Sequence, residues 1–313
     1  MSVAEPSVFA RRLRSRVGDS ALLLSTAAAT LLVLVALGII LVDVIGHGLP
    51  RLTWTFLSSA PTKGMTEGGV FPAIFGTVAM TIMMTIAVVP AGVATAVYLH
   101  EYADRESSLT RIIRVAVNNL AGVPSIVFGL FGLGFFIQFV GGGMDRVFFS
   151  GQKVFGQPAL LWASLTMAVL TLPVVIVTTE EALRAVPREL REASLALGAT
   201  QFQTVIKVVL PQATAGILTG TILAISRGAG EVAPILFTGA AYYLPQLPWN
   251  PQSQFMHLGY HVYVLATQSA DVDAARPLLY GTVLVLLAVT FVLNLSAFVV
   301  RSRMRSRFAG ASA

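Results

Sequence analysis

The sequence predicts an all-α membrane protein with six transmembrane helices. Three observations predict it: six long apolar runs, a low content of charged residues, and Lys and Arg residues that fall mainly in alternate gaps between the runs. Hydrophobic residues make up 55% of the 313 residues and charged residues only 12%, which is about half the share usual in soluble domains. Most of the chain is therefore expected to face lipid or other helices.

Each apolar run is close to the length of about 20 residues that a helix needs to cross the hydrocarbon core. The runs cover residues 21–42, 73–99, 115–140, 159–179, 213–240 and 278–300. The first run could be taken for the apolar part of a cleaved signal peptide, which spans about 7–15 residues. It continues unbroken to Val42, so an uncleaved first helix is the better interpretation.

The basic residues predict the orientation of the chain. Fifteen of the 21 Lys and Arg residues precede the first run, follow the last run, or lie in the second and fourth gaps. By the positive-inside rule those segments, and so both termini, are cytoplasmic. The fifteen are Arg11, Arg12, Arg14, Arg16, Arg105, Arg111, Arg114, Arg184, Arg188, Arg191, Lys207, Arg301, Arg303, Arg305 and Arg307. The opposite gaps hold only Arg51, Lys63, Arg146, Lys153 and Arg276.

Composition also excludes several classes of protein. The net charge of +6 is divided between separate segments, which does not fit the single basic stripe of a nucleic-acid binder. The absence of cysteine excludes disulfides, Cys-ligated zinc and iron–sulfur clusters. No lysine follows a glycine, so the chain lacks the phosphate-binding loop of an ATPase. His257 and His261 have the spacing of a zinc-peptidase motif, but Leu258 stands where that motif needs Glu.

The segments predicted to lie outside are mostly loops. Residues 46–69 carry several Pro and Gly residues and one possible short turn around residues 52–57. Residues 141–143 are Gly-Gly-Gly, which indicates a turn or a flexible link. Residues 241–276 contain five Tyr and Trp residues, which either form a belt at the membrane interface or dock a soluble partner. They are Tyr242, Tyr243, Trp249, Tyr260 and Tyr263.

The fourth gap, residues 180–211, is patterned as two short helices. After Pro187, apolar or small residues recur at helical spacing on a face opposite the charged ones; they are Leu190, Ala193, Ser194 and Leu197. Gly198 stands where a left-handed helix stop is expected. Thr200 and Gln203 then form a capping box that begins a second helix, which Pro211 ends. The pattern predicts a helix–Gly–helix hairpin on the cytoplasmic surface, with or without a partner.

This hairpin resembles the EAA motif of ABC importer permeases. The motif is carried by Glu192, Ala193 and Ser194, then by Gly198, and then by Leu210 and Pro211; Ser194 replaces the usual second Ala. The resemblance implies a MetI-like permease fold of six helices. It also implies that the hairpin, at about residues 187–211, is the coupling helix that contacts a separate ATPase. This chain would then bind no cofactor, because its partner uses ATP and Mg.

Two further motifs resemble phosphate importer permeases. Residues 119–132 are similar to the third span of these permeases, and residues 230–240 to the fifth span of the PstA-type subunit. The resemblance implies a PstC-type sister permease, a PstB-type ATPase dimer and a periplasmic or extracellular phosphate-binding protein as partners. It places the chain in a bacterial plasma (inner) membrane. The expected domains are residues 1–69 (tail, first span and outer loop), a permease core of residues 70–300, and a basic tail of residues 301–313.

The candidate substrate pathway centres on Arg227 and Glu231, which lie within the fifth apolar run. A charge at the bilayer centre costs about 2.5–3.5 kcal/mol, so the two must face a cavity, a partner or each other. Their i, i+4 spacing permits a salt bridge, and nearby Gly and Pro residues weaken the helix, as in the broken helices that line transport pathways. Arg suits phosphate, but a purely structural ion pair stays possible. Asn118 and Ser125 are further pathway candidates, or else hydrogen bond between helices.

Together these observations predict a permease subunit of an ATP-driven phosphate importer. It is not itself an enzyme. Sulfate and molybdate importers share the fold and stay open as alternatives. A secondary carrier is less favoured because no internal repeat is visible, and a mere membrane anchor leaves Arg227 and Glu231 unexplained.

Overall fold

The structure is a computed structural model that describes residues 8–65, 67–104, 106–269 and 271–309. The side chains of residues 8–18, 64, 272 and 304–309 lie outside this description, and with them those of Arg11, Arg12, Arg14, Arg16, Arg305 and Arg307. Within the described residues, six helices are long and apolar enough to cross a membrane. They are Asp19–Arg51, Phe71–Tyr102, Ser125–Phe148, Leu160–Arg184, Gln201–Gly230 and Asp273–Arg303. The predicted all-α fold with six spans is confirmed.

The elements follow the chain as a series of helices with one small hairpin of strands. They are α1 (Val8–Gly48), η1 (Leu49–Arg51), α2 (Trp54–Ser58), β1 (Pro61–Thr62), η2 (Lys63–Met65), β2 (Glu67–Gly68), α3 (Phe71–Val97), η3 (Tyr98–Tyr102), α4 (Ser108–Leu120), α5 (Ser125–Phe131), η4 (Gly132–Gly141), α6 (Gly142–Phe148), α7 (Leu160–Arg184), α8 (Arg188–Ala196), α9 (Gln201–Thr204), η5 (Val205–Val209), α10 (Leu210–Gly230), α11 (Ile235–Thr238), α12 (Leu258–Thr267) and α13 (Val272–Ala309). Of the η segments, η1 and η2 are 3-10 helices, and η3, η4 and η5 are π-helical. The antiparallel strands β1 and β2 pair Pro61 with Gly68.

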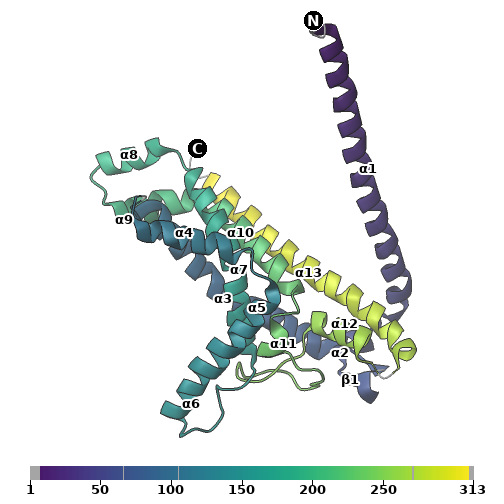
Figure 1. Cartoon of the computed structure of the whole chain (residues 1–313). Helices are drawn as coiled ribbons and strands as arrows, with labels where there is room; N and C mark the ends of the chain where they lie inside the picture. The colour runs from purple at the N-terminus through teal and green to yellow at the C-terminus, as the bar shows by residue number, and fades with distance from the viewer. Residues whose placement is uncertain (1–7, 66, 105, 270, 310–313) are drawn as a thin grey trace, which may run out of the picture.

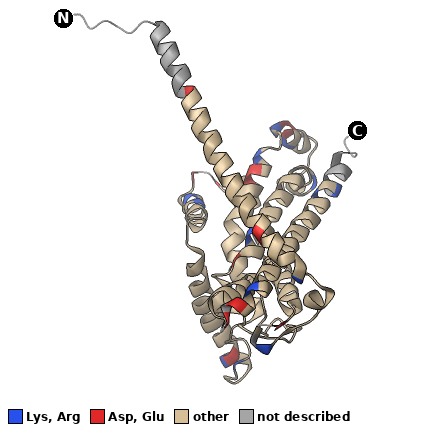
Figure 2. Ribbon diagram, turned by 90° about the vertical axis from the view of Figure 1, so that its right-hand side faces the viewer, with Lys and Arg blue, Asp and Glu red and all other residues tan. Residues whose placement is uncertain are grey.

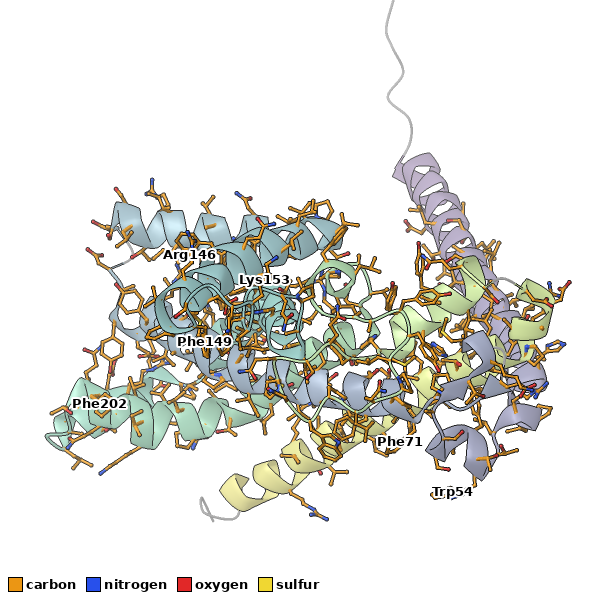
Figure 3. The ribbon with its side chains drawn as sticks, turned by 90° about the horizontal axis from the view of Figure 1, so that it is seen from below. Trp54, Phe71, Arg146, Phe149, Lys153 and Phe202 are labelled. Carbon is orange, nitrogen blue, oxygen red and sulfur yellow. The ribbon has the colours of Figure 1, made fainter. Side chains whose placement is uncertain are left out.

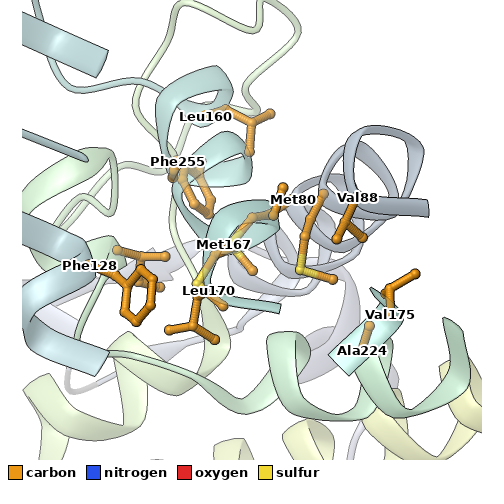
Figure 4. Close-up of a cluster of buried hydrophobic side chains, with 13 residues drawn as sticks. Met80, Val88, Phe128, Leu160, Met167, Leu170, Val175, Ala224 and Phe255 are labelled. Atoms are coloured by element: carbon orange, nitrogen blue, oxygen red, sulfur yellow. The ribbon is translucent and has the colours of Figure 1, made fainter. Parts of the chain in front are cut away.

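The centre of the fold is the packing of α7 between α3 and α10, around buried side chains such as Met80, Met167 and Ala224 (Figure 4). α10 approaches α7 through Gly216 and Gly220, where an added Cβ would collide with Ala182 and Thr178. This spacing of small residues lets two helix backbones pack closely, which is how membrane helices associate without a strong hydrophobic force between them. The three helices form the scaffold that holds the rest.

The two ends of the bundle differ. The α8–α9 hairpin and the C-terminus lie at one end, and α2, β1 and α6 lie at the other (Figure 1). Lys, Arg, Asp and Glu gather mostly toward the ends, while the stretch of α1 between Asp19 and Asp43 carries none (Figure 2). This distribution is what the cost of burying charge in hydrocarbon requires.

α1 meets the rest of the chain near its C-terminal end and leans away toward its N-terminus (Figure 1). The contact is with α13, where the Tyr280 hydroxyl donates to the Asp43 carboxylate at 2.9 Å and the His47 ring lies 5.0 Å from the Tyr280 ring. Asp43, near the C-terminal end of α1, therefore has a partner in the last span. The apolar length of α1 is largely exposed in the isolated chain.

Three predictions about where helices begin, end or break are wrong. The third span begins at Ser125 and not at residue 115, because the chain turns at residues 121–124 and the preceding segment forms a separate amphipathic helix, α4. Pro124 disfavours a helical conformation in the residue before it, which explains the break. The Gly-Gly-Gly segment is helical and joins η4 to α6. The second hairpin helix does not end at Pro211 but continues from Gln201 through η5 into α10.

The loop after the third span is fastened by one carboxylate. Asp145 is 3% exposed, and its oxygens accept the backbone N–H groups of Val154, Phe155 and Gly156 at 3.1, 2.8 and 2.7 Å. The three donors are partly buried, and leaving them without an acceptor would be costly. Asp145 thus fixes the path of the chain between α6 and α7.

We expect Asp145→Ala to lower the unfolding temperature of the purified protein by several degrees, because it leaves those three N–H groups without an acceptor. Asp273→Ala is the matched control, since the Asp273 side chain is 88% exposed and forms only a surface ion pair with Arg276. The measurement is thermal unfolding in detergent. Equal unfolding temperatures for the two variants would contradict the role given to Asp145.

Candidate functional site

The predicted helix–Gly–helix hairpin is present. α8 ends in a left-handed turn at Gly198, whose φ is +86°, and the backbone N–H of Gly198 donates to the carbonyl of Leu195 at 2.9 Å. Thr200 and Gln203 then form the predicted capping box, in which each side chain accepts the other's backbone N–H. The expected stop and start signals are therefore confirmed as local geometry.

The hairpin is attached to the ends of two spans that lie beside it. The Arg191 guanidinium donates to the Glu101 carboxylate at 3.1 Å and to the carbonyl of Leu183 at 2.7 Å. The Gln201 side chain donates to the backbone carbonyl of Glu101 at 2.6 Å. Because Glu101 ends the second span and Leu183 lies near the end of the fourth, a movement of the hairpin is transmitted to both. The sequence pattern placed Arg191 only on a polar face and did not reveal this attachment.

Within the motif, Ser194 joins the two helices of the hairpin. Its hydroxyl lies 2.9 Å from the hydroxyl of Thr204, a contact that the more common Ala could not make. Glu192 and Ala193 are exposed. The apolar side chains of the hairpin are exposed as well: Leu190, Leu195, Leu197 and Phe202 are 40%, 48%, 90% and 66% exposed, and Phe202 lies at the margin of the bundle (Figure 3). Of the predicted stripe, Ser194 is therefore used inside the hairpin, whereas Leu190, Ala193 and Leu197 are left exposed.

Leu210 and Pro211 belong to the base of the hairpin and not to its exposed edge. Leu210 packs against the buried cluster of Leu183, Val186 and Ala213. Pro211 follows directly on the π-helical turn of η5, Val205–Val209. A proline inside an α-helix removes one hydrogen bond and its ring clashes with the carbonyl four residues earlier, and the wider π turn changes the hydrogen-bond register at that point. The helix therefore continues where we expected it to stop.

The fifth span breaks beside the two charged residues. α10 ends at Gly230, Glu231 is the residue that caps it in an extended conformation, and α11 begins only after Pro234. The Arg227 Nε atom lies 3.7 Å from a Glu231 carboxylate oxygen, and the side chains are 38% and 24% exposed. The predicted ion pair and the predicted broken helix are both present, at the end of a helix and not in its middle.

Arg227 is only loosely engaged. Charge-assisted N–H···O bonds usually measure about 2.7–2.9 Å, so the 3.7 Å contact with Glu231 is an ion pair without a tight hydrogen bond. Among the described residues no hydrogen bond from Arg227 is present. The neighbouring Ser226 hydroxyl is bonded instead to Asn294 of α13 at 2.7 Å. The guanidinium therefore has donors available at a partly open position.

Neither of the other two pathway candidates forms a hydrogen bond with Arg227 among the described residues. Asn118 lies near the end of α4, outside any candidate span, and lines a small cavity of about 180 Å³ with Arg114 and Glu180. Ser125 is the first residue of α5 and is partly buried. Their part in a pathway stays a prediction.

The outer aromatic residues are used partly to hold loops together. The Tyr243 hydroxyl donates to the carbonyl of Pro61 at 3.1 Å, and the Tyr242 hydroxyl reaches the carbonyl of Gln268 at 3.5 Å. Tyr260 and Tyr263 are stacked with centroids 6.2 Å apart. Trp249 is 79% exposed and lies against Phe75. Neither the belt nor the docking interpretation is decided by these contacts.

The two histidines of the outer segment are buried. His257 and His261 are 1% and 2% exposed, and the Nε2 atom of His257 and both ring nitrogens of His261 lack a hydrogen-bond partner among the described residues. The part of the chain that the structure describes contains no group of three or more His, Cys, Asp or Glu residues able to hold a metal. Burial lowers the pKa of His257 to about 3 and that of His261 to about 4, so both rings are neutral.

Comparison with known proteins identifies the architecture. A family model described as "Binding-protein-dependent transport system inner membrane component" matches residues 88–308. A relative from Bacillus subtilis, "Probable ABC transporter permease protein YqgI", is 32% identical over 266 residues, covering 81% of this chain and 85% of that protein. "Phosphate transport system permease protein PstA 1" from Mycobacterium tuberculosis is 34% identical, covering 79% and 74%.

Solved structures agree on the fold. The chain superposes on a subunit of the inward-facing MetNI methionine ABC transporter with a TM-score of 0.55 at 19% identity, covering 74% of this chain and 94% of that one. It superposes on a bacterial alginate ABC transporter with a TM-score of 0.63 at 15% identity, covering 91% and 96%. The predicted MetI-like permease fold is therefore confirmed.

The buried histidines predict an acid-sensitive fold. An unfolded His has a pKa of about 6.5, so the unfolded chain takes up protons that the folded chain excludes. The contribution of the two neutral rings to the free energy of unfolding is complete above about pH 6.5. It is lost as the pH falls toward the folded pKa values of about 4 and about 3.

We expect the unfolding temperature, followed by tryptophan fluorescence in detergent, to fall between about pH 7.5 and about pH 5.5. His261→Phe should reduce this fall, because it removes one of the two groups that titrate. An unchanged pH dependence in His261→Phe would show that the buried ring is not responsible.

Proposed function

The chain belongs to the family of binding-protein-dependent transport system inner membrane components, and from that membership we propose that it is a permease subunit of an ATP-driven importer of inorganic phosphate. The observation that carries the proposal is Arg227, a partly open guanidinium with free donors at the break of the fifth span. Relatives named as phosphate transport permeases share about a third of their residues with this chain over most of its length. Arg is the residue best suited to bind phosphate through two donors at once.

The charge chemistry at the break fits a translocated anion. An isolated phosphate in the low dielectric of a membrane is strongly disfavoured, and one fixed guanidinium offsets part of its charge. Glu231 keeps Arg227 oriented at 3.7 Å without occupying its donors. Gly230 and Pro234 interrupt the helix there, so backbone groups are also available to the substrate. Arg227 is the residue that binds the anion, and Glu231 is the residue that positions Arg227.

ATP-driven transport requires partners that supply energy and substrate. The exposed edge of the hairpin is the surface for a PstB-type ATPase dimer. Leu195 and Leu197 lie at its tip, and Glu192, Ala193 and Gly198 lie along it. A PstC-type sister permease completes the cavity beside Arg227. A phosphate-binding protein delivers the substrate at the opposite end, near the loop of residues 241–276. The positive-inside charge pattern supports a cytoplasmic location for the hairpin and both termini.

The transport cycle follows from how the hairpin is attached. ATP binding and hydrolysis in the partner displace α8. Arg191 passes this displacement to Glu101 and Leu183, which belong to the second and fourth spans. Because α7 packs between α3 and α10, the helix that carries Arg227 moves with them. The cavity then opens inward and phosphate leaves. Sulfate and molybdate are the competing substrates, since they are oxyanions that a guanidinium also binds.

The hairpin can be tested at its glycine. Gly198→Val introduces a Cβ at a φ of +86°, which a β-branched residue adopts only with strain. We expect phosphate uptake to collapse while the protein still inserts, because the hairpin no longer presents its edge correctly to the ATPase.

Gly151→Val is a closely matched control. Gly151 has a φ of +84°, and an added Cβ would meet no atom within 4 Å at either glycine, so both variants carry the same kind of local strain. Gly151 lies in the outer loop between α6 and α7, far from the hairpin in sequence. Uptake lost equally in both variants would contradict a coupling role specific to Gly198.

The charged pair separates substrate binding from a structural role. If Arg227 binds phosphate, Arg227→Gln should reduce uptake by about ten-fold or more, the effect of losing one hydrogen bond to a charged group, while assembly with the partners persists. Arg227→Lys should restore uptake only in part, because an ammonium lacks the planar pair of donors. Arg276→Gln, which removes an exposed outer arginine, is the control.

A double variant tests the alternative. If the pair is only a structural lock, either single change leaves an unpaired charge, and Arg227→Gln combined with Glu231→Gln should recover assembly and uptake together. Recovery of uptake in that double variant would refute direct binding of phosphate by Arg227. The measurements are uptake in cells and co-purification of the ATPase.

A further inference from the structure

A cluster of arginines, separate from Arg227, lies at the hairpin end of the bundle. A pocket of about 580 Å³ is lined by His100, Arg114, Arg184, Arg188 and Arg191. These side chains come from η3, α4, α7 and α8, four elements that are separate in the sequence. The pocket is distinct from the break of the fifth span, and of the residues that line it the proposed transport cycle uses only Arg191.

Two of the four guanidinium groups are held at the side of the pocket by hydrogen bonds to carboxylates and backbone carbonyls. Arg114 donates to the Glu180 carboxylate at 3.1 Å and to the carbonyl of Leu99 at 2.7 Å. Arg191 donates to Glu101 and to backbone carbonyls in the same way, and its side chain is 18% exposed. Each of these charges is therefore balanced by one carboxylate and held in place by backbone.

The other two guanidinium groups are not balanced. Arg184 is 62% exposed, and its nearest carboxylate, that of Glu180, is 3.9 Å away and already accepts from Arg114. Arg188 makes no hydrogen bond or ion pair with any described residue. Like charges gathered in one pocket repel each other, so the arrangement is stabilised when an anion enters.

We propose that this pocket binds a phosphate group, that of free inorganic phosphate or that of an anionic phospholipid headgroup. Guanidinium groups bind phosphate oxygens through parallel N–H donors, and several of them converging from different helices match its tetrahedral set of oxygens. Basic pockets between membrane helices on the cytoplasmic side are known places for lipid headgroups. The proposal does not depend on which anion the protein transports.

The residues around the pocket can accommodate either a phospholipid or free inorganic phosphate. α4 carries an exposed apolar face, with Leu109, Ile112 and Val115 at 61%, 64% and 52% exposure, on the same helix as Arg114. Acyl chains of a bound lipid can lie along that face. Phosphate released inward reaches the pocket from the aqueous side, because Arg184 and Arg188 are exposed.

Occupancy has a mechanical consequence. Arg188 and Arg191 belong to the hairpin, whereas Arg114 and Arg184 belong to α4 and the fourth span. A phosphate group bound by both pairs bridges the hairpin to the membrane helices. The bound group therefore reinforces the attachment that Arg191 and Gln201 already make in its absence.

The test uses the full complex with its sister permease and ATPase, carrying Arg227→Gln so that the proposed transport site does not contribute. One arm measures binding of radiolabelled inorganic phosphate in nanodiscs of zwitterionic lipid. The other measures phosphatidylglycerol retained in native mass spectra. The double change Arg184→Gln with Arg188→Gln removes the two unbalanced charges. Arg111→Gln with Lys207→Gln removes two basic residues of the same end that do not line the pocket.

We expect one of the two probes to bind, and its affinity to fall by about ten-fold or more in the Arg184/Arg188 variant, as for lost hydrogen bonds to a charged group. The Arg111/Lys207 control should bind as the parent does. Arg188→Gln alone, which breaks no contact and so leaves folding intact, should give a smaller loss. Failure of both probes to bind the parent, or an equal loss in the control, would overturn the proposal.

Discussion

The high free-energy cost of charge in hydrocarbon decides where the charged residues of this protein lie. The ion pairs lie where helices end or break: Arg114 with Glu180 and Arg191 with Glu101 at the hairpin end, and Arg227 with Glu231 where α10 stops. Between them, small and apolar residues pack α3, α7 and α10 into one rigid group. A rigid apolar centre with polar ends lets a displacement at the hairpin reach Arg227 without exposing charge to lipid.

Most of the fold could be predicted from apolar runs and basic gaps, because lipid permits few alternatives to a helix. The errors have one origin. A hydropathy run does not distinguish a continuous helix from two helices separated by Pro124, nor an end at Pro211 from a helix that continues after a π turn. Both depend on backbone hydrogen bonds around a proline. Gly141 to Gly143 are a further case, without a proline: they are helical because the hydrogen bonds of η4 and α6 continue through them.

For the candidate site, local signals were reliable and long-range contacts were not visible. Gly198 and the Thr200–Gln203 box are encoded within a few residues, and the structure has both. The attachment of Arg191 to Glu101, 90 residues away, could not be read from helical spacing. Nor could the bond between Ser194 and Thr204, which gives the departure from the usual motif a structural purpose. The ion pair at the break was predictable from its spacing. The long separation of 3.7 Å, which leaves the donors of Arg227 free, could not be predicted from the sequence.

The most direct measurement is transport in proteoliposomes that contain this chain, its sister permease and the ATPase, with the binding protein outside. Uptake of labelled phosphate is followed with and without ATP inside, and in the presence of excess sulfate or molybdate. A phosphate importer predicts uptake that depends on ATP and is not reduced by the other oxyanions. Uptake without ATP, or labelled sulfate or molybdate entering in place of phosphate, would contradict it.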